Sequence, residues 1–254
     1  MTSSRQFVYD SYVSGLCDRE LNRRADEVIS RKTEELLMKA AELADLIKSR
    51  RSIRVWQQKQ VPEDLLRQAV ELATYAPNAG NQQIWYFYII LNKKIIGSIA
   101  DAVQANADYI ASWPEAAKFG ETTARMLQRS SFFRNAPAAV AVAARQYRSP
   151  LEELSAIREE TDPRAKQIRQ ARNTANARIQ SVASAIAYLL LVLHQMGLGV
   201  VWMTGPMQAK DEIEKILGVP KEMDLVAFIP VGYPAETPAL RERKPVKEVC
   251  QIIK

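Results

Sequence analysis

Three guanidinium groups and one hydroxyl fall within five residues of this sequence, in the segment Arg50-Arg51-Ser52-Ile53-Arg54. A guanidinium is a planar fork of N–H donors, so it forms paired hydrogen bonds with phosphate and with planar carbonyl groups. A second basic stretch, Arg241-Glu242-Arg243-Lys244-Pro245, lies near the other end of the chain. Each stretch suits the binding of an anion, and each is also consistent with a basic surface exposed to solvent.

Two polar turns have side chains or backbone groups that suit a ligand. Pro77–Trp85 is a polar turn rich in amides that leads into a strand, and such amides either recognise the edge of a heterocycle or only cap a helix. The stretch Trp202-Met203-Thr204-Gly205-Pro206 ends an apolar run with a glycine, where a ligand can approach the backbone closely. Each turn is a weak signal when it is taken alone.

The common catalytic motifs are absent from the sequence. There is no G-x-x-x-x-G-K-[ST] loop, no G-x-G-x-x-G, no nucleophile elbow and no H-E-x-x-H. The single histidine, His194, lies in an apolar stretch, where a core or helix-end role is favoured over a general base. Cys17 and Cys250 lie near opposite ends of the chain, so the sequence predicts neither a zinc site nor a disulfide framework. The lack of a disulfide framework fits a protein of a reducing compartment.

Composition is that of an ordinary globular protein. The chain has 254 residues, of which 47% are hydrophobic and 25% are charged, so it can bury a substantial core. The net charge of +6 suits an anionic ligand such as a nucleotide, although it also serves solubility. We find no recognised nucleic-acid-binding motif, and no secretory signal follows the first residues.

The pattern of apolar residues predicts alternating helices and strands. Residues 1–48 are predicted to be helical, with one apolar stripe, and a helix opens at Pro62-Glu63-Asp64 and stops near Ala76-Pro77. Aromatic and β-branched residues predict a strand at Trp85–Leu91, and a second strand follows at Ala138–Ala144. The intervening residues 92–135 are predicted to be mostly helical.

A capped helix is predicted from Asp162-Pro163 to about Met196, ended by Gly197-Leu198-Gly199. Val200–Met203 and Leu225–Val231 are the third and fourth strands, so the fold class is α+β. No charged side chain occurs from Ile179 to Ala209, but Gln180, His194 and the glycines interrupt this stretch. We therefore interpret it as a buried helix, a turn and a strand rather than a membrane span. A helix that is apolar all round must be covered, and a subunit interface would cover it.

Taken together and in order, the four segments resemble the FMN-dependent nitroreductase family. The resemblance covers residues 48–250 and rests on Arg50–Arg54, the run A-P-N-A-G-N-Q-Q-I-W at Ala76–Trp85, G-L-G-V-V-W at Gly197–Trp202, and the tail with Gly232-Tyr233-Pro234 and Arg241–Pro245. Asn78 and Ile84 depart from the family pattern, which has serine and proline at these positions.

The resemblance implies a fold, an assembly and a cofactor. It implies a mixed central sheet flanked by helices, in an intertwined homodimer with FMN at the interface. Residues 1–48 would be a helical extension and residues 49–254 the FMN-binding domain, in which 92–135 form a variable cap over the substrate pocket. The implied FMN-binding residues are Arg50, Arg51, Ser52, Arg54, Pro77, Asn78, Asn81, Gln83, Met203, Thr204, Gly205, Arg241 and Arg243.

The resemblance also implies roles within this set. Arg50, Arg51 and Ser52 would hold the phosphate and ribityl end, joined by Arg241 and Arg243. Arg54 and Asn81 would meet the pyrimidine edge of the flavin ring, and Thr204 and Gly205 would offer backbone N–H groups near N5. A fixed cation at Arg54 would stabilise the negative charge that the reduced ring gains. Flavin carries the redox chemistry, so no catalytic side chain and no metal is required.

The implied activity is hydride transfer from NAD(P)H through FMN to a small-molecule acceptor. The acceptor would be a nitroaromatic, a quinone or an enone, and the cycle would be ping-pong in a cytoplasmic enzyme. Three alternatives stay open: a flavin-fragmenting or dehalogenating branch of the same superfamily, a non-catalytic or regulatory flavin-binding protein, and a nucleic-acid-binding protein that uses the positive charge.

Overall fold

The computed structural model describes residues 38–254. The chain divides into two compact units, Met1–Ser49 and Arg50–Lys254. Residues 38–49 of the first unit are helical, as predicted, while residues 1–37 of the expected helical extension and Cys17 lie outside the described residues. The second unit contains the sheet, the helices that cover it, and all of the residues predicted to bind FMN.

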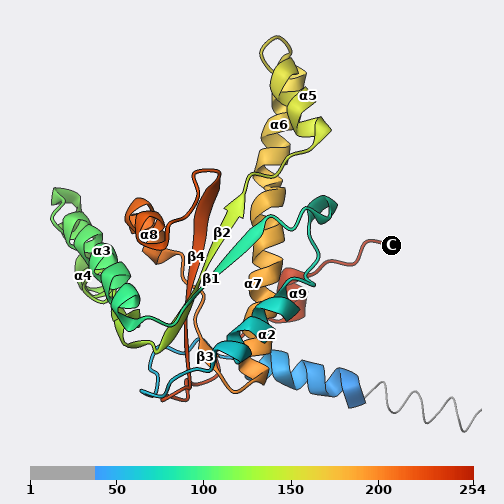
Figure 1. Cartoon of the computed structure of the whole chain (residues 1–254). Coiled ribbons are helices and arrows are strands. Elements are labelled where there is room, and N and C mark those ends of the chain that lie inside the picture. The colour runs from blue at the N-terminus through green and yellow to red at the C-terminus, as the bar shows by residue number, and fades with distance from the viewer. Residues whose placement is uncertain (1–37) are drawn as a thin grey trace, which may run out of the picture. The chain divides into compact units, whose positions relative to one another are not determined.

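The sheet has four strands in the order β1-β2-β4-β3, and neighbouring strands are antiparallel (Figure 1). The strands are β1 Trp85–Ile90, β2 Ala138–Arg145, β3 Gly199–Val200 and β4 Met223–Gly232. The α+β class and the positions of the first, second and fourth predicted strands are therefore confirmed. Parallel pairing, expected from a mixed sheet, is limited among the described residues to an isolated bridge between Ser52 and Val200.

The third strand is shorter than predicted. We expected Val200–Met203, whereas β3 ends at Val200, and Met203 pairs separately with Phe228. The register Val200↔Val231 and Met203↔Phe228 places Val201 opposite Pro230. Proline has no N–H to donate to the ladder, so the strand is interrupted at this point although its path continues.

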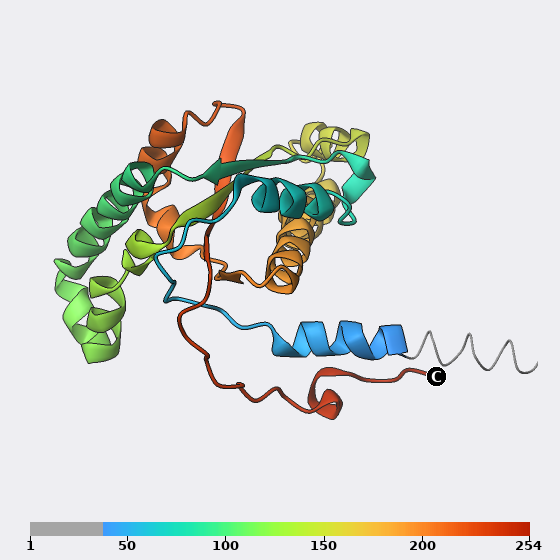
Figure 2. The same cartoon turned by 60° about the horizontal axis from the view of Figure 1, so that its bottom comes forward.

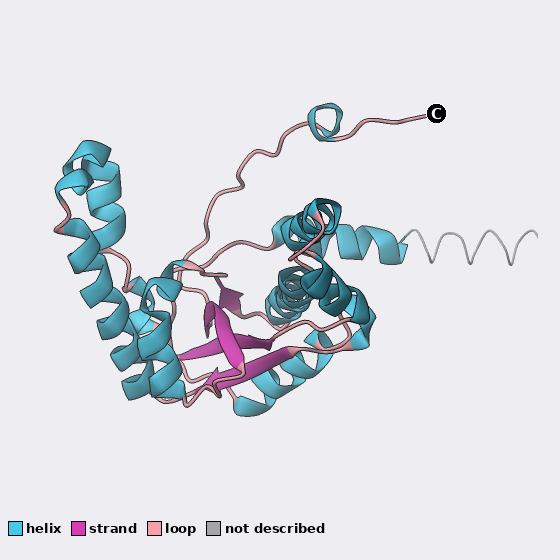
Figure 3. Cartoon of the chain, turned by 90° about the horizontal axis from the view of Figure 1, so that it is seen from above, coloured by secondary structure: helices cyan, strands magenta, loops and turns pink. Residues whose placement is uncertain are grey.

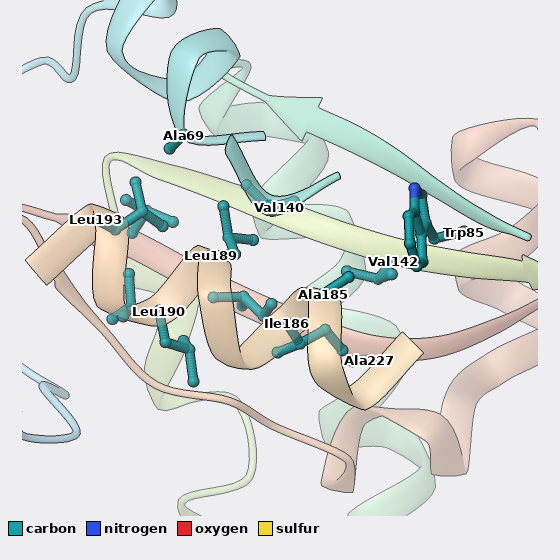
Figure 4. Close-up of a cluster of buried hydrophobic side chains, with 14 of the residues drawn as sticks. Ala69, Trp85, Val140, Val142, Ala185, Ile186, Leu189, Leu190, Leu193 and Ala227 are labelled. Carbon is teal, nitrogen blue, oxygen red and sulfur yellow. The ribbon is translucent and has the colours of Figure 1, made fainter. Parts of the chain in front are cut away.

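Helices cover both faces of the sheet (Figure 3). On one face α2 (Glu63–Ala73) and α7 (Ala177–Gln195) pack against Val140 and Val142 of β2. Figure 4 shows Ile186 and Leu189 of α7 among the buried side chains that face Val140 and Val142 of β2. On the other face α3 (Lys93–Ala111) and α8 (Lys210–Leu217) share a second core with the alternate β2 residues. The alternation of side chains along β2 therefore separates two hydrophobic cores.

The segment 92–135 is mostly helical, as predicted. It consists of α3, the short helix η2 (Pro114–Phe119), α4 (Gly120–Gln128) and the turn η3 (Phe132–Asn135). Two further helices, α5 (Pro150–Arg158) and α8, and the short α9 (Val246–Val249) were not anticipated from the sequence. The helix expected at Pro62 begins at Glu63, because Pro62 keeps an extended backbone at the N-cap position.

The long helix predicted from Pro163 to Met196 is in fact two helices. α6 (Pro163–Ala175) stops at Asn176, whose backbone is left-handed with φ 46° and ψ 68°. Asparagine tolerates this conformation, and its side chain accepts a hydrogen bond from the Ile179 N–H to begin α7. The expected cap at Asp162 is confirmed, since its carboxylate accepts from the N–H groups of Arg164 and Ala165.

α7 is not covered on every side in the described structure. One face is buried in the core, whereas Ile179, Ala187 and Tyr188 are exposed, with 43% of Tyr188 accessible. By length and composition the stretch Pro163–Gln195 is also apolar enough to cross a membrane, a property that core helices of globular proteins share. Gly197 ends α7 with φ 77°, as the sequence predicted.

Candidate functional site

The first basic segment runs along β3. The Ile53 N–H donates to the Val200 carbonyl over 3.0 Å, and the buried indole N–H of Trp56 donates to the Gly199 carbonyl over 2.9 Å. The contact is close because residue 199 is a glycine, since a Cβ there would lie 2.7 Å from Cγ1 of Ile53. The backbone of the segment is thus fixed to the sheet, and the exposed side chain of Arg54 projects from this fixed backbone.

The same segment pairs on its other side with the chain that leaves β4. The Gln57 N–H donates to the Tyr233 carbonyl over 2.9 Å, and the Ala235 N–H donates to the Val55 carbonyl over 3.0 Å. Next to this pairing, Oε1 of Glu236 accepts hydrogen bonds from the backbone N–H groups of Arg54 and Val55. The C-terminal tail that carries Arg241 and Arg243 therefore starts beside Arg54.

Positive charges gather around Arg50. Burial, followed by the charges of Arg51 and Arg243, lowers the pKa of Arg50. Burial, followed by the charges of Arg50 and Arg51, also lowers the pKa of His194, which is near the end of α7. Among the described residues no carboxylate forms an ion pair with Arg50 or Arg243. An anion bound between these groups would relieve their mutual repulsion.

Met203, Thr204 and Gly205 lie at the same edge of the sheet. Met203 and Phe228 exchange backbone hydrogen bonds of 3.0 Å, three residues beyond the point where Val200 meets Ser52. Thr204 and Gly205 are exposed at the start of the short helix η4 (Gly205–Ala209). The first N–H groups of a helix have no acceptor inside it, so these amides suit a polar ligand atom.

The loop Pro77–Gln83 lies elsewhere. The Ala79 N–H donates to Oγ of Ser181, and Oγ of Ser184 donates to the Pro77 carbonyl, so the loop is fastened to the first half of α7. His194 is 10 to 13 residues further along the same helix, which corresponds to about 15–20 Å at about 1.5 Å per residue. The loop and the Arg50 region therefore lie toward opposite ends of α7.

The loop is held in an unusual shape by its own side chains. Gly80, Asn81 and Gln83 have positive φ values, and Oδ1 of Asn78 accepts from the Gln83 N–H over 3.0 Å. Asn78, which departs from the family pattern, thus braces the loop. The exposed side chains of Asn81 and Gln83 contact each other at its tip, where they are accessible to a ligand.

Sequence reasoning missed the residues that hold this site together. Glu236, Trp56 and Gly199 join the Arg50–Arg54 segment to the rest of the unit, and none of them belongs to a run of typical ligand-binding residue types. Their only sequence signal was proximity to recognised segments: Gly199 within Gly197–Trp202, Trp56 just after Arg54, and Glu236 just after Gly232-Tyr233-Pro234.

Comparison with known proteins identifies the family. A BluB-like flavoprotein from Clostridium difficile 630 superposes with a TM-score of 0.73 at 29% identity, covering 84% of this chain and 99% of that protein. An iodotyrosine deiodinase bound to FMN and 3-iodo-L-tyrosine superposes with a TM-score of 0.60 at 25% identity, covering 84% and 97%. An NADH dehydrogenase of Thermus thermophilus is 27% identical over 216 residues, covering 79% of this chain and 90% of its own. Residues 47–233 match the Nitroreductase family, and the chain belongs to that family.

Proposed function

We propose that this protein is an FMN-dependent oxidoreductase that transfers hydride from NAD(P)H to a small-molecule acceptor in a ping-pong cycle. The observation that carries the proposal is the convergence of three separate segments, Arg50–Arg54, Met203–Gly205 and the tail with Arg243, at one edge of the sheet. Membership of the nitroreductase family and the flavin bound to a structural relative support it.

The residues at this edge fit the parts of FMN. Burial, followed by the charges of Arg51 and Arg243, lowers the pKa of Arg50, and a phosphate bound beside Arg50 would offset this repulsion. Arg241 and the Ser52 hydroxyl extend the same clamp toward the ribityl chain. The bound flavin would supply reversible hydride transfer, chemistry that no side chain offers.

The remaining residues would orient and tune the ring. Arg54 projects from a backbone that is fixed on both sides, so its charge is preorganised to stabilise negative charge at the pyrimidine edge. The backbone N–H groups of Thr204 and Gly205 would meet the ring near N5, and Met203 would contact it. None of these residues needs to accept a proton during hydride transfer.

We further propose that the site requires two copies of the chain. The loop that carries Pro77, Asn78, Asn81 and Gln83 is fastened to the first half of α7. Its anchor points on the helix are about 15–20 Å, by helix rise, from His194, which the charge of Arg50 reaches. In a twofold homodimer packed through the exposed faces of two antiparallel α7 helices, the loop of one copy would approach the arginines of the other. The exposed Ala187 and Tyr188 would then be covered.

This two-copy site has a direct test by complementation. Arg54→Ala and Asn81→Ala would each impair FMN retention in a homodimer, because every site loses one residue. A mixed dimer of the two variants would contain one intact site and one site lacking both residues. Mixing and refolding gives mixed dimers in half of the population, so recovery of about a quarter of the bound FMN supports the proposal, whereas no recovery indicates that both residues serve one site within one chain.

The acceptor would be a nitroaromatic, a quinone or an enone, and the enzyme would act in the cytoplasm. The decisive experiment is a visible spectrum of the purified protein before and after anaerobic addition of NADH and NADPH. A yellow protein that is bleached and then recovers its colour with a nitroaromatic supports the proposal. Failure to retain or take up FMN would refute it, and bound FMN that NAD(P)H cannot bleach would indicate a non-catalytic flavin protein.

Reductive dehalogenation is a second candidate, favoured by the likeness to the iodotyrosine deiodinase. The two activities are separated by supplying the reduced protein with 3-iodo-L-tyrosine or with a nitroaromatic. Iodide release that exceeds nitro reduction would favour the dehalogenase. Analysis of the flavin after turnover would reveal the third branch, flavin fragmentation, by the loss of intact FMN.

A further inference from the structure

Glu236 is partly buried at the start of the C-terminal tail, and its carboxylate has two backbone partners in another segment. Its Oε1 accepts from the N–H groups of Arg54 and Val55, the latter over 3.0 Å. Two successive amides that share one carboxylate oxygen hold that backbone in a defined direction, and hydrogen bonds to a charged acceptor are the stronger kind. This contact joins residues 182 positions apart in the chain.

The contact continues a strand-like pairing that would otherwise end. Ala235 donates to the Val55 carbonyl, Gln57 donates to the Tyr233 carbonyl, and the side-chain amide of Gln57 donates to the Pro234 carbonyl over 2.9 Å. In an antiparallel pair, the Val55 N–H would normally meet the Ala235 carbonyl. The Glu236 carboxylate accepts from that N–H instead, and extends the pairing to Arg54.

The described tail residues between Glu236 and Arg241 form no hydrogen bond to the rest of the unit. Glu236 is therefore the last point at which the tail is fastened before its two arginines. The mostly exposed residues beyond it lead directly to Arg241 and Arg243, and Figure 2 shows this tail leaving the helical layers. The charge of Arg243 nevertheless acts on Arg50. The direction in which the tail starts therefore decides whether the arginines of both segments face one ligand.

We infer that Glu236 is a positioning residue for flavin binding, which ties the Arg50–Arg54 segment to the tail so that the guanidinium groups of both converge on the phosphate. The inference rests on the proposed FMN site. Glu236 itself accepts hydrogen bonds from backbone N–H groups, and as a carboxylate it would repel a phosphate. Its contribution is therefore geometric, which distinguishes it from the arginines that it positions.

Three substitutions separate geometry from charge. Glu236→Ala removes the acceptor, and we expect FMN to bind about tenfold or more weakly. Glu236→Gln keeps an oxygen at the same reach, so FMN affinity should stay within about threefold of the wild type. Glu236→Asp keeps the charge but withdraws the carboxylate by one methylene group, so it should weaken binding as alanine does. Glu248→Ala, an exposed carboxylate later in the tail, is the matched charge control.

FMN affinity is measured by fluorescence titration of each apoprotein, together with the reduction potential of the bound flavin. With Arg54 poorly placed, the potential of Glu236→Ala should become more negative, whereas that of Glu248→Ala should not change. Wild-type affinity in Glu236→Ala and Glu236→Asp would overturn the inference. So would equal effects of Glu236→Gln and Glu236→Ala, because charge rather than geometry would then act.

These measurements distinguish a failure of the proposed FMN-binding function from a failure of the role inferred for Glu236. A wild-type protein that does not bind FMN contradicts the proposed function, and a wild-type protein that binds FMN while Glu236→Ala binds it equally well contradicts only the role of Glu236. Should Glu236→Ala fail to fold, Glu236→Asp decides the question: unchanged affinity refutes positioning, and weakened affinity with an unchanged thermal midpoint supports it.

Discussion

Replacing Gly199 with alanine should loosen the Arg50–Arg54 segment without touching any residue proposed to bind FMN. A Cβ at position 199 would lie 2.7, 2.8 and 2.9 Å from Cγ1, Cβ and Cγ2 of Ile53. Carbon atoms in contact prefer separations of about 3.5–4.0 Å, so the two segments must move apart by roughly 0.8 Å or more. Ile53 is buried and cannot rotate away, because all three contacts include or adjoin its Cβ.

The size of the effect follows from this displacement. Overpacking in a core costs about 1–3 kcal/mol, which lowers the thermal midpoint of a domain this size by roughly 2–12 °C. The Ile53 N–H also bonds to the Val200 carbonyl over 3.0 Å, so Arg50 and Arg54 move with Ile53. Losing one charge-assisted hydrogen bond to FMN costs about 1.5–3 kcal/mol, which corresponds to roughly 10- to 150-fold weaker binding.

Urea unfolding of the apoprotein and FMN titration of the folded protein measure the two effects separately. Gly97→Ala is the control, because a Cβ there meets nothing within 4 Å and alanine in helix α3 should be neutral or stabilising. An unchanged unfolding midpoint would refute the packing argument. A lowered midpoint with unchanged FMN affinity would refute the link between this contact and the flavin site.

Three other changes test separate parts of the structure. Ala187→Arg on the exposed face of α7 should give monomers with little bound FMN, measured by light scattering and absorbance, and a flavin-bound dimer would exclude this face from the interface. Asn176→Ala should cost about 1–2 kcal/mol in urea unfolding, because alanine disfavours a left-handed backbone, whereas Asn176→Gly should cost less. The pKa of His194 is lowered by burial, then by Arg50 and Arg51, so the folded state binds fewer protons than the unfolded state between that lowered pKa and 6.5. Stability should therefore fall as the pH decreases through this window, and His194→Gln should flatten that dependence in urea unfolding at each pH.

Most of the fold could be predicted from local patterns. Pro137 and the alternating small and branched residues after it locate β2, and the aromatic run at Trp85 locates β1, since both signals are complete within a few residues. The predictions were wrong where a single residue acts through geometry. Asn176 divides one apparent helix into two, and Pro230 interrupts β3 from the facing strand, 29 residues away in the chain.

The candidate site was predictable only in part for the same reason. Guanidinium groups are recognisable as residue types, so Arg50, Arg54 and Arg243 could be proposed from the amino-acid sequence alone. Glu236 hydrogen-bonds to backbone N–H groups, and any backbone offers such groups, so no sequence pattern marks the contact. Residues that bind a ligand are thus easier to predict from sequence than those that position them.

The placement of Pro77–Gln83 has a consequence for how flavin binding and assembly depend on each other. The loop is tied to Ser181 and Ser184, and the charges at Arg50 act on His194, so α7 is the spacer between the two groups. A helix of this length cannot shorten, so the two groups of one chain are held about 15–20 Å apart along α7, and the proposed site takes the arginines from one chain and the loop from the other. If both groups contact one flavin, then binding of FMN and association of two chains are thermodynamically linked, and each must strengthen the other by the same factor. Dilution of the protein should therefore release flavin, and added flavin should shift monomers toward the dimer.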